Sequence, residues 1–237
     1  MPLQLLSILA CLLFIQGSFS QSAKPSRKDS VLKIQKVNDF EVTGKGMAAQ
    51  WNSAQWISLT KRKGNVAYES KFKIVYSLTG IYCLYYCEDK QITSTLKEDF
   101  ADIYNEDVVE VFFWTDESSP VYFEYELSPF NFELPIIVPN YRGDFFGWRP
   151  WHYEGERKTK HEAYILEVDG KVKSWMAEFF IPFALLKPLQ NVPPRSGTRW
   201  RANFYRIDYD NGSTEWTWKK VRNNFHDYKK YGMLEFE

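Results

Sequence analysis

Apolar residues alternate with polar ones along most of this chain, and this period of two restricts its fold more than any other feature. Side chains that alternate in this way point to opposite faces of a β-strand, so each such segment can bury one face. Val, Ile, Phe, Tyr and Trp dominate the buried positions, as β-strands prefer. About ten strands are predicted, at residues 66–76, 81–87, 107–115, 121–127, 131–138, 163–168, 172–180, 198–208, 214–218 and 232–236.

Turn-forming dipeptides separate these segments. Asp169-Gly170 and Asn211-Gly212 are strong hairpin signals, because these residues accept the left-handed backbone of a two-residue turn. Helix signals are scarce, and only Pro182 followed by residues 183–186 predicts one short helical turn. We therefore expect an all-β fold, an antiparallel β-sandwich of jelly-roll-like topology with one short helical turn.

The first 30 residues differ in composition from the rest of the chain. Residues 5–15 form an apolar run too short to span a bilayer, and Ser18-Phe19-Ser20 fits the small-x-small pattern of a cleavage site. We expect a signal peptide at 1–20, a polar leader at 21–30 and one domain at 31–237, secreted or periplasmic. A membrane anchor, or a lipoprotein acylation site at Cys11, is the alternative.

Charge and cysteine content exclude several classes of partner. The chain has 30 Lys and Arg against 30 Asp and Glu, so no net field attracts nucleic acid or anionic lipid. With three His and three Cys in the chain, we expect no structural zinc site. Cys83 and Cys87 lie four residues apart in one predicted strand, a rise of about 13 Å, so we expect two buried free thiols rather than a disulfide.

Aromatic residues make up 18% of the chain, and several stand among charged residues. The densest examples surround Trp148 and Trp151 in one segment and Trp216 and Trp218 in another. We expect such rings to be poorly buried and therefore suited to stack on the apolar face of a sugar. Packing inside a tyrosine- and tryptophan-rich sandwich is the alternative.

A series of short motifs runs through the chain in a fixed order. They are Trp51-Asn52-x-Ala54-x-Trp56, Gly80-Ile81-Tyr82-x-Leu84, Tyr104-Asn105-Glu106-Asp107-Val108-Val109-Glu110, Trp175-Met176-Ala177-Glu178-x-x-Ile181-Pro182-Phe183, Trp200-x-x-Asn203, Trp216-x-Trp218 and Tyr231-Gly232-x-Leu234. The ordered set covers almost all of the chain after residue 30 and resembles the family 9 carbohydrate-binding modules, especially their secreted stand-alone relatives in Bacteroidetes. The resemblance implies a β-sandwich that binds the ends of sugar chains between two aromatic rings, with calcium in some members.

The resemblance also places individual site residues. Tyr104 stands three residues before Asp107, where the family carries one stacking Trp, and Trp218 looks like the second, with Trp216 the neighbouring alternative. The residues that the resemblance suggests for bonding sugar hydroxyls are Arg206, Tyr205, Asn203 and Glu124.

Two departures from the family pattern concern the same site. Glu124 falls where the family carries a sugar-bonding Arg. The segment 141–162 looks longer than in the sugar-binding prototypes, and its Trp148 and Trp151 offer either a second platform for sugar or an anchor for the loop itself.

Acidic residues suggest a structural Ca²⁺ ion, since calcium takes six to eight oxygen ligands. Glu88-Asp89 follows a predicted strand, and Glu98, Asp99 and Asp102 lie in the loop beyond it. Solvated acidic turns are the alternative. Glu110 lies in an apolar strand and needs a partner, such as Arg201 or Arg206, because a lone buried carboxylate is costly.

We expect non-catalytic carbohydrate binding by a monomer, in support of polysaccharide breakdown, with a glycosidase as its partner. Its ligand would be a glycan or oligosaccharide. Two alternatives belong to other classes. A glycoside hydrolase would use two of the carboxyls, and the candidates are Glu110, Glu124, Glu126 and Glu178. A haem-binding electron carrier of the DOMON type would use Met176 with one histidine, and the candidates are His152, His161 and His226.

Overall fold

The computed structural model describes residues 31–141 and 144–237, so the expected signal peptide and leader lie outside the described residues. Within them the strands are β1 (Val31–Ile34), β2 (Ile57–Ser58), β3 (Thr60–Lys63), β4 (Ser70–Tyr76), β5 (Gly80–Glu88), β6 (Val108–Trp114), β7 (Val121–Leu127), β8 (Glu133–Tyr141), β9 (Asp144–Phe145), β10 (Arg149–Pro150), β11 (Lys160–Val168), β12 (Lys171–Pro182), β13 (Arg199–Asp208), β14 (Thr214–Thr217) and β15 (Gly232–Phe236). The helices are α1 (Phe183–Leu186) and short 3₁₀ turns at Ala49–Ser53, Ile103–Asn105, Gly155–Arg157 and Tyr228–Lys230.

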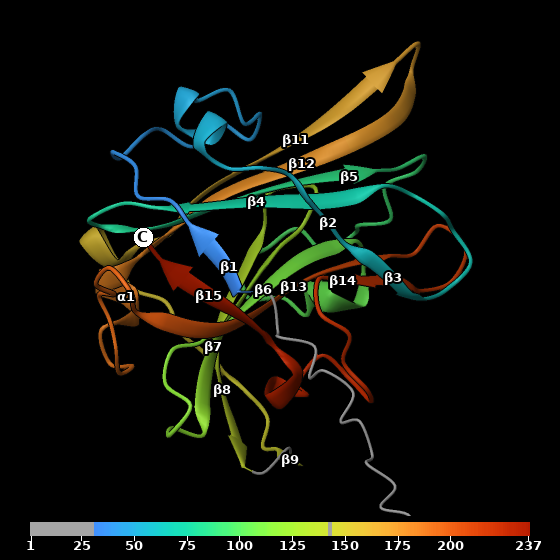
Figure 1. The fold of residues 1–237 in the computed structure, drawn as a ribbon. Helices are drawn as coiled ribbons and strands as arrows, with labels where there is room; N and C mark the ends of the chain where they lie inside the picture. The colour runs from blue at the N-terminus through green and yellow to red at the C-terminus, as the bar shows by residue number, and fades with distance from the viewer. Residues whose placement is uncertain (1–30, 142–143) are drawn as a thin grey trace, which may run out of the picture.

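Two sheets pack face to face and form the β-sandwich (Figure 1). The larger sheet has ten strands and runs β1-β15-β13-β6-β7-β8-β10, with β14, β3 and β9 joined beside this path. The smaller sheet has five strands in the order β11-β12-β5-β4-β2. Neighbouring strands are antiparallel except β1 and β15, which pair in parallel at one edge. The predicted sandwich and its single short helix are therefore confirmed.

Alternation along the central strands supplies the core between the sheets. Val109, Val111 and Phe113 of β6 point inward and join one continuous cluster with residues of the five-stranded sheet. The closest ring contact across it stacks Phe72 on Phe204, with centroids 3.8 Å apart. Burying these large rings is the main favourable contribution to folding.

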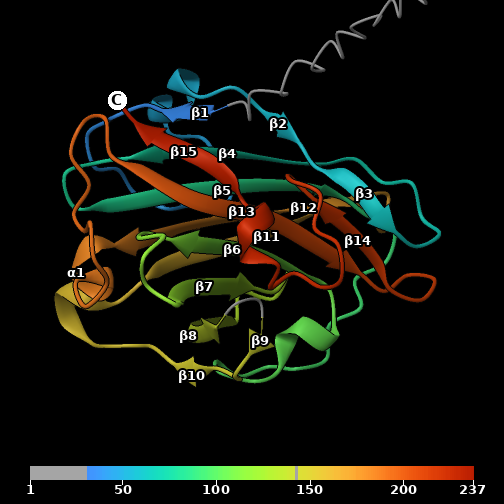
Figure 2. The ribbon, with the colours of Figure 1, turned by 60° about the horizontal axis from the view of Figure 1, so that its bottom comes forward.

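The outer face of the ten-stranded sheet is also buried. Val108 and Phe112 of β6 and Tyr205 of β13 form a second cluster there, with residues of the 219–231 segment lying over it. Figure 2 shows this segment and the 88–107 segment beside β6, β7 and β14. Strands buried on both faces read as nearly continuous apolar runs, which explains the sequence of β6, Val108-Val109-Glu110-Val111-Phe112-Phe113-Trp114.

Several local predictions agree with the structure in detail. The strands β7 and β15 occupy the predicted residues, and α1 follows Pro182, which stands at its N-cap. The Asp169-Gly170 turn has positive φ at both residues, 52° and 68°, as a two-residue hairpin between β11 and β12 requires. The strands that were not predicted, such as β2, β9 and β10, span two residues each and carry no periodic signal.

Cys83 and Cys87 are free and buried, as predicted. Both lie on β5 and both point into the cluster between the sheets, because positions four apart in a strand share a face. Burial raises the pKa of each thiol above its usual value. They therefore behave as small apolar core residues.

No helix in the described part of the chain is long and apolar enough to cross a membrane.

The prediction that charged neighbours keep Trp216 exposed is wrong. Its side chain is only 2% exposed, and its ring lies 4.9 Å from the Arg206 guanidinium in the core. The neighbours Glu215 and Thr217 point to the other face of β14. A tryptophan between charged residues is thus compatible with burial whenever the segment is a strand.

We expect Trp216→Ala to destabilise the protein by ~3–5 kcal/mol, because it leaves a large cavity between the sheets. Urea unfolding followed by circular dichroism measures this free energy. Trp56→Ala is the matched control, since that ring is 38% exposed, and it should cost less than ~1 kcal/mol. Equal losses for the two variants would contradict the described core.

Candidate functional site

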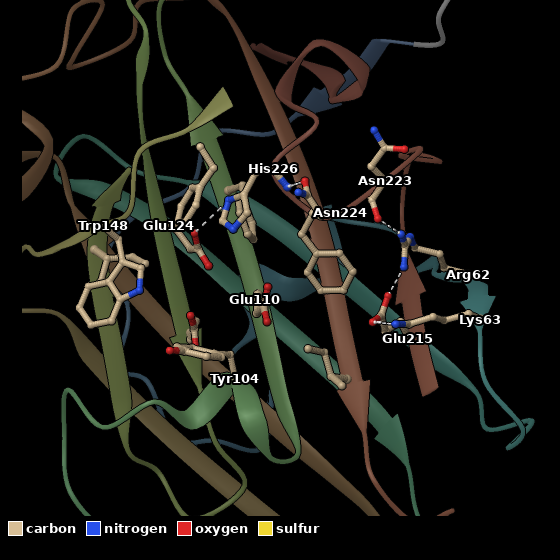
Figure 3. Close-up of a pocket in the computed structure, with 16 residues that line it drawn as sticks. Arg62, Lys63, Tyr104, Glu110, Glu124, Trp148, Glu215, Asn223, Asn224 and His226 are labelled. Carbon is tan, nitrogen blue, oxygen red and sulfur yellow. Dashed lines mark hydrogen bonds and ion pairs between the residues drawn. The ribbon is translucent and has the colours of Figure 1, made fainter. Parts of the chain in front are cut away.

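A cleft of about 370 Å³ opens on the outer face of the ten-stranded sheet. This volume lies within the ~300–1,000 Å³ typical of small-molecule sites. Strands β6 and β7 form its base, and the loops at 96–107, 145–148 and 219–231 rise around it (Figure 3). The residues that line it are Arg62, Lys63, Tyr104, Glu110, Phe112, Glu124, Glu126, Ile136, Phe145, Trp148, Ile207, Glu215, Asn223, Asn224, Phe225 and His226.

Three carboxyl groups form the base of the cleft, and we call Glu110, Glu124 and Glu126 the acidic floor. Glu110 of β6 lies directly opposite Glu126 of β7 in the strand register, and Glu124 lies two residues along β7. All three point to the outer face because they share the parity of their strands. Their exposed fractions are 2%, 4% and 1%, so these carboxyls are almost entirely removed from water.

Aromatic rings stand on the walls of the cleft. Tyr104 and Trp148 are half-buried on one side, as Figure 3 shows. Phe145 stacks on the imidazole of His226, with ring centroids 4.2 Å apart and an interplanar angle of 21°. Phe225 completes the lining beside Asn224. Rings on separate walls above polar groups are the arrangement that can hold a flat, partly apolar ligand.

The cations at the cleft do not neutralise the acidic floor. Arg62 and Lys63 of β3 both pair with Glu215 on β14, and the Lys63 Nζ to Glu215 Oε1 distance is 2.7 Å. His226 Nδ1 lies 3.9 Å from Glu124 Oε2. Burial lowers the pKa of His226 to about 4, so its ring is neutral at pH 7.

The expected partners of Glu110 are not found. Arg201 pairs with Glu117, and Arg206 points to the opposite face of β13. Within the described residues no cation pairs with Glu110. Burial, followed by the neighbouring charges of Glu124 and Glu215, raises the pKa of Glu110 well above its usual value. Burial likewise raises the pKa of Glu126, and it raises that of Glu124 to about 8.

Arg206 lies outside the cleft, in the core, because adjacent residues of a strand face opposite ways. It is fully buried, and its Nη2 donates to Asp89 Oδ2 at 2.9 Å and to Asp208 Oδ2 at 2.6 Å. Its Nη1 donates to the Glu88 carbonyl at 2.6 Å and to Ser70 Oγ at 3.0 Å. Arg206, which the resemblance suggested for bonding sugar hydroxyls, is therefore not among the residues that line the cleft.

The carboxylates beside Arg206 could hold a metal ion. Ligand oxygens of Asp89, Asp208 and Asp210 lie within 4.8 Å of one another, and we call these three residues the aspartate triad. Burial raises the pKa of Asp89 to about 7, although the Arg206 charge opposes this. Asp210 Oδ1 is buried and has no hydrogen-bond partner. Oxygen donors of this kind suit Ca²⁺, and Asp89 belongs to the acidic pair singled out in the sequence.

Asn203 and Tyr205 are buried beneath a wall of the cleft and hold it in place. Asn203 Nδ2 donates to the Lys219 carbonyl at 2.9 Å, and Asn203 Oδ1 accepts from the Lys219 amide at 2.9 Å. Tyr205 Oη donates to the Phe225 carbonyl at 2.9 Å, and its ring stacks on that of Phe225, with centroids 4.0 Å apart. They fix the 219–225 segment, and neither lines the cleft.

Tyr104 and Trp218 do not face each other. Trp218 is half-buried against the cluster between the sheets, where its ring meets Phe72 and Phe204 edge to face at 6.0 and 5.7 Å. Tyr104 packs on the outer face of the ten-stranded sheet. The expected clamp between these two rings is therefore not formed. Trp151 also packs against the inner cluster and donates to the Leu185 carbonyl at 3.0 Å.

Met176 does not meet any of the three histidines. It packs against a small cluster on the outer side of the five-stranded sheet. His226 lines the cleft, His161 bonds Asn131, and His152 packs on Phe100. An axial Met and His pair, which the haem alternative needs, is not formed by these residues.

Sequence reasoning identified Tyr104, Glu124 and Trp148 as sugar-binding residues, and it named Glu110, Glu126 and His226 only for the alternative functions. The ring of Phe225 was missed, and it belongs to Arg222-Asn223-Asn224-Phe225-His226, a polar run that carries aromatic side chains just before the last strand. The position of this run, shortly before the Tyr231-Gly232 motif, could have indicated that its rings line the cleft. Trp218 was predicted instead, because the family carries a stacking Trp at this point of the sequence.

Comparisons with known proteins agree with this architecture. Residues 42–237 match the family described as carbohydrate family 9 binding domain-like. The chain belongs to this family. The comparison with curated proteins finds no match.

Solved structures share the fold at low sequence identity. A Bacteroides uniformis protein, provisionally described as carbohydrate-binding, superposes with a TM-score of 0.71 at 16% identity, covering 87% of this chain and 99% of its own. A family 9 module from Caldicellulosiruptor kristjanssonii in complex with cellotriose superposes with a TM-score of 0.65 at 14% identity, covering 88% of this chain and 94% of its own. A family 9 module from the same organism in complex with glucose superposes with a TM-score of 0.62 at 15% identity, covering 86% of this chain and 95% of its own.

The acidic floor makes stability depend on pH. The folded protein retains protons on carboxyls such as Glu124, whose pKa is raised from 4.5 to about 8, whereas the unfolded chain loses them. The free energy of unfolding should therefore fall as the pH rises from about 5 to 8, by up to ~1.4 kcal/mol per pH unit for each group that titrates. Glu124→Gln should flatten this slope in urea titrations made with chelator present.

Glu156→Gln is the matched control, because this carboxyl is exposed and lies away from the cleft. It should leave the slope unchanged. If the free energy of unfolding of Glu124→Gln fell with pH as steeply as that of the wild type, the floor would not retain protons.

Proposed function

We propose that the cleft binds carbohydrate without cleaving it. The observation that supports this most is the set of rings on its walls, Tyr104, Trp148, Phe145 and Phe225, above polar groups at its base. A pyranose ring has apolar faces that stack on such side chains and hydroxyls that need hydrogen-bond partners at its edges. Membership of the carbohydrate family 9 binding domain-like family supports the same ligand class.

Polar side chains around the rings can bond the hydroxyls. Asn223 lies beside Arg62 and Asn224 beside His226 in the lining of the cleft (Figure 3). The acidic floor lies in the same cleft. Affinity for a sugar in such an open cleft should be modest, on the order of micromolar to millimolar, because the hydroxyls give up water to bind.

The geometry favours binding over hydrolysis. Glycoside hydrolysis needs two carboxyls that flank the scissile bond from different sides. Glu110, Glu124 and Glu126 all rise from the same base. Glu178 is buried and accepts hydrogen bonds from Trp51 Nε1 at 2.7 Å and from the Thr43 amide at 3.0 Å, so it serves the fold.

We also propose that the protein is exported through a signal peptide at 1–20 and acts as a monomer that supports polysaccharide breakdown beside a glycosidase. The apolar run at 5–15 and the small residues Ser18 and Ser20 support export. A non-catalytic binding domain supports polysaccharide breakdown by holding the glycan close to a glycosidase that cleaves it.

The binding proposal is tested first by a glycan-array screen and then by calorimetry on the best glycan. Tyr104→Ala and Trp148→Ala should each weaken binding by at least about 10-fold, since each removes a stacking surface. Trp56→Ala should leave the affinity unchanged, because this exposed ring lies away from the cleft. Binding that survives both cleft variants would place the sugar elsewhere.

We propose that the aspartate triad holds a structural Ca²⁺ ion. Two of the three carboxyls pair with the one guanidinium of Arg206, and the third, Asp210, lies beside them, so a further cation would balance the buried charge and occupy the unpartnered Asp210 Oδ1. The triad lies beside Arg206 on the inner side of the ten-stranded sheet, and the acidic floor lies on the outer side. The ion would therefore stabilise the fold and would not contact a ligand in the cleft.

Ca²⁺ at about 100 times its Kd should stabilise the protein by ~2.7 kcal/mol, measured as a rise in unfolding temperature after treatment with chelator. Asp210→Asn should abolish this rise. Glu98→Gln is the control, because it alters the other acidic stretch noted in the sequence. If Glu98→Gln alone lost the calcium-induced rise in unfolding temperature, the ion would bind in that loop instead of at the triad.

A further inference from the structure

The acidic floor combines burial with a lack of partners outside itself. Glu124 Oε2 and Glu126 Oε2 are buried, line the cleft and accept no hydrogen bond from another described residue, although the two carboxyls hydrogen-bond each other. Among the described residues no hydrogen bond to the Glu110 carboxyl is found either. Buried polar atoms are nearly always satisfied in native proteins, and an unsatisfied one lowers stability. Such atoms at the base of an open cleft indicate that the missing partner belongs to a ligand.

The other charged and titratable groups around the floor do not supply this partner. Arg62 and Lys63 pair with Glu215, as described above. The neutral His226 shares its Nδ1 with Tyr122 Oη at 2.6 Å. Further neighbours are Tyr104, whose pKa burial raises to about 12, and Asp102, which adds a further negative charge. Four more tyrosines whose pKa burial raises also lie near Glu110 or Glu124, and they are Tyr122, Tyr205, Tyr209 and Tyr231.

We propose that the ligand of this cleft is an amino sugar, a pyranose that carries a free ammonium group in place of one hydroxyl. This inference rests on the proposed carbohydrate binding. An ammonium group carries three N–H donors and a positive charge, and it can donate to Glu110, Glu124 and Glu126 together. The rings of Tyr104, Trp148 and Phe225 would hold the sugar above the floor.

The chemistry of the floor discriminates against the uncharged relatives of such a sugar. A hydroxyl at the same position can bond protonated carboxyls, but it brings one donor and no charge, so it cannot offset the charge of the floor once its carboxyls ionise. An N-acetyl group brings one N–H and a methyl group that would lie against the carboxyls. In the free protein the raised pKa of the floor keeps protons on it, and a bound ammonium group would release them to solvent.

Pairs of sugars that differ only in this group give the test. Isothermal titration calorimetry on the full chain at pH 7 compares D-glucosamine with D-glucose, D-galactosamine with D-galactose, and short oligomers of glucosamine with those of glucose. In at least one pair the amino sugar should bind tighter by on the order of 10- to 100-fold, and the N-acetylated sugar should bind no better than the neutral one.

Two floor variants and one control locate the effect. Glu124→Gln and Glu126→Gln keep the shape of the side chain and remove the charge, so each should cut the preference for the amino sugar at least about fivefold. Glu156→Gln removes one exposed negative charge elsewhere and should leave the preference intact. A preference that persists in both floor variants would show general attraction to cations and overturn the inference.

The outcomes separate this inference from the proposed function. Neutral sugars that bind equally well, with binding lost in Tyr104→Ala, would overturn the amino-sugar assignment and leave carbohydrate binding in place. No binding of either member of any pair would overturn both.

Discussion

The structure depends on the burial of both faces of the ten-stranded sheet. The inner face packs on the five-stranded sheet, and the outer face packs beneath the 219–231 segment. Because an antiparallel sheet commonly leaves one face to water, covering the second face needs added structure. The cover is incomplete over Glu110 and Glu124, and this gap is the cleft. The same packing that stabilises the sheet therefore creates a base of desolvated carboxyls.

Buried charge is handled in two different ways on the two faces of the large sheet. On the inner side Arg206 neutralises part of the aspartate triad through direct ion pairs with Asp89 and Asp208. On the outer side the acidic floor has no such partner among the described residues, and its carboxyls retain protons instead. Burying an unpaired charge is costly, so the first arrangement supports the fold and the second leaves capacity for a ligand.

Alternation within strands made much of the fold predictable. The period of two located the long strands, the Asp169-Gly170 dipeptide located the hairpin turn and Pro182 located the short helix, because each of these is set by local sequence. The same rule, applied residue by residue, would have assigned Arg206 to the core, since Tyr205 and Arg206 are neighbours on β13 and face opposite ways. It would also have assigned Trp216 and Trp218 to one inner face.

The composition of the cleft was less predictable, because it depends on how distant loops fold over the sheet. Phe145 and His226 stack on each other although 81 positions separate them, and no local pattern encodes that contact. Glu110 and Glu126 come together only through the register of β6 and β7. Tyr104, Glu124 and Trp148 were found because the family resemblance or their polar surroundings marked them.

The most direct test of the account is a crystal structure of the protein with its best-binding sugar. The account predicts the sugar ring between the walls of the cleft, near Tyr104 and Phe225, with one edge of the ring on Glu110 and Glu124. Density for the sugar at Trp218, or on the outer side of the five-stranded sheet, with the cleft left to water, would contradict it.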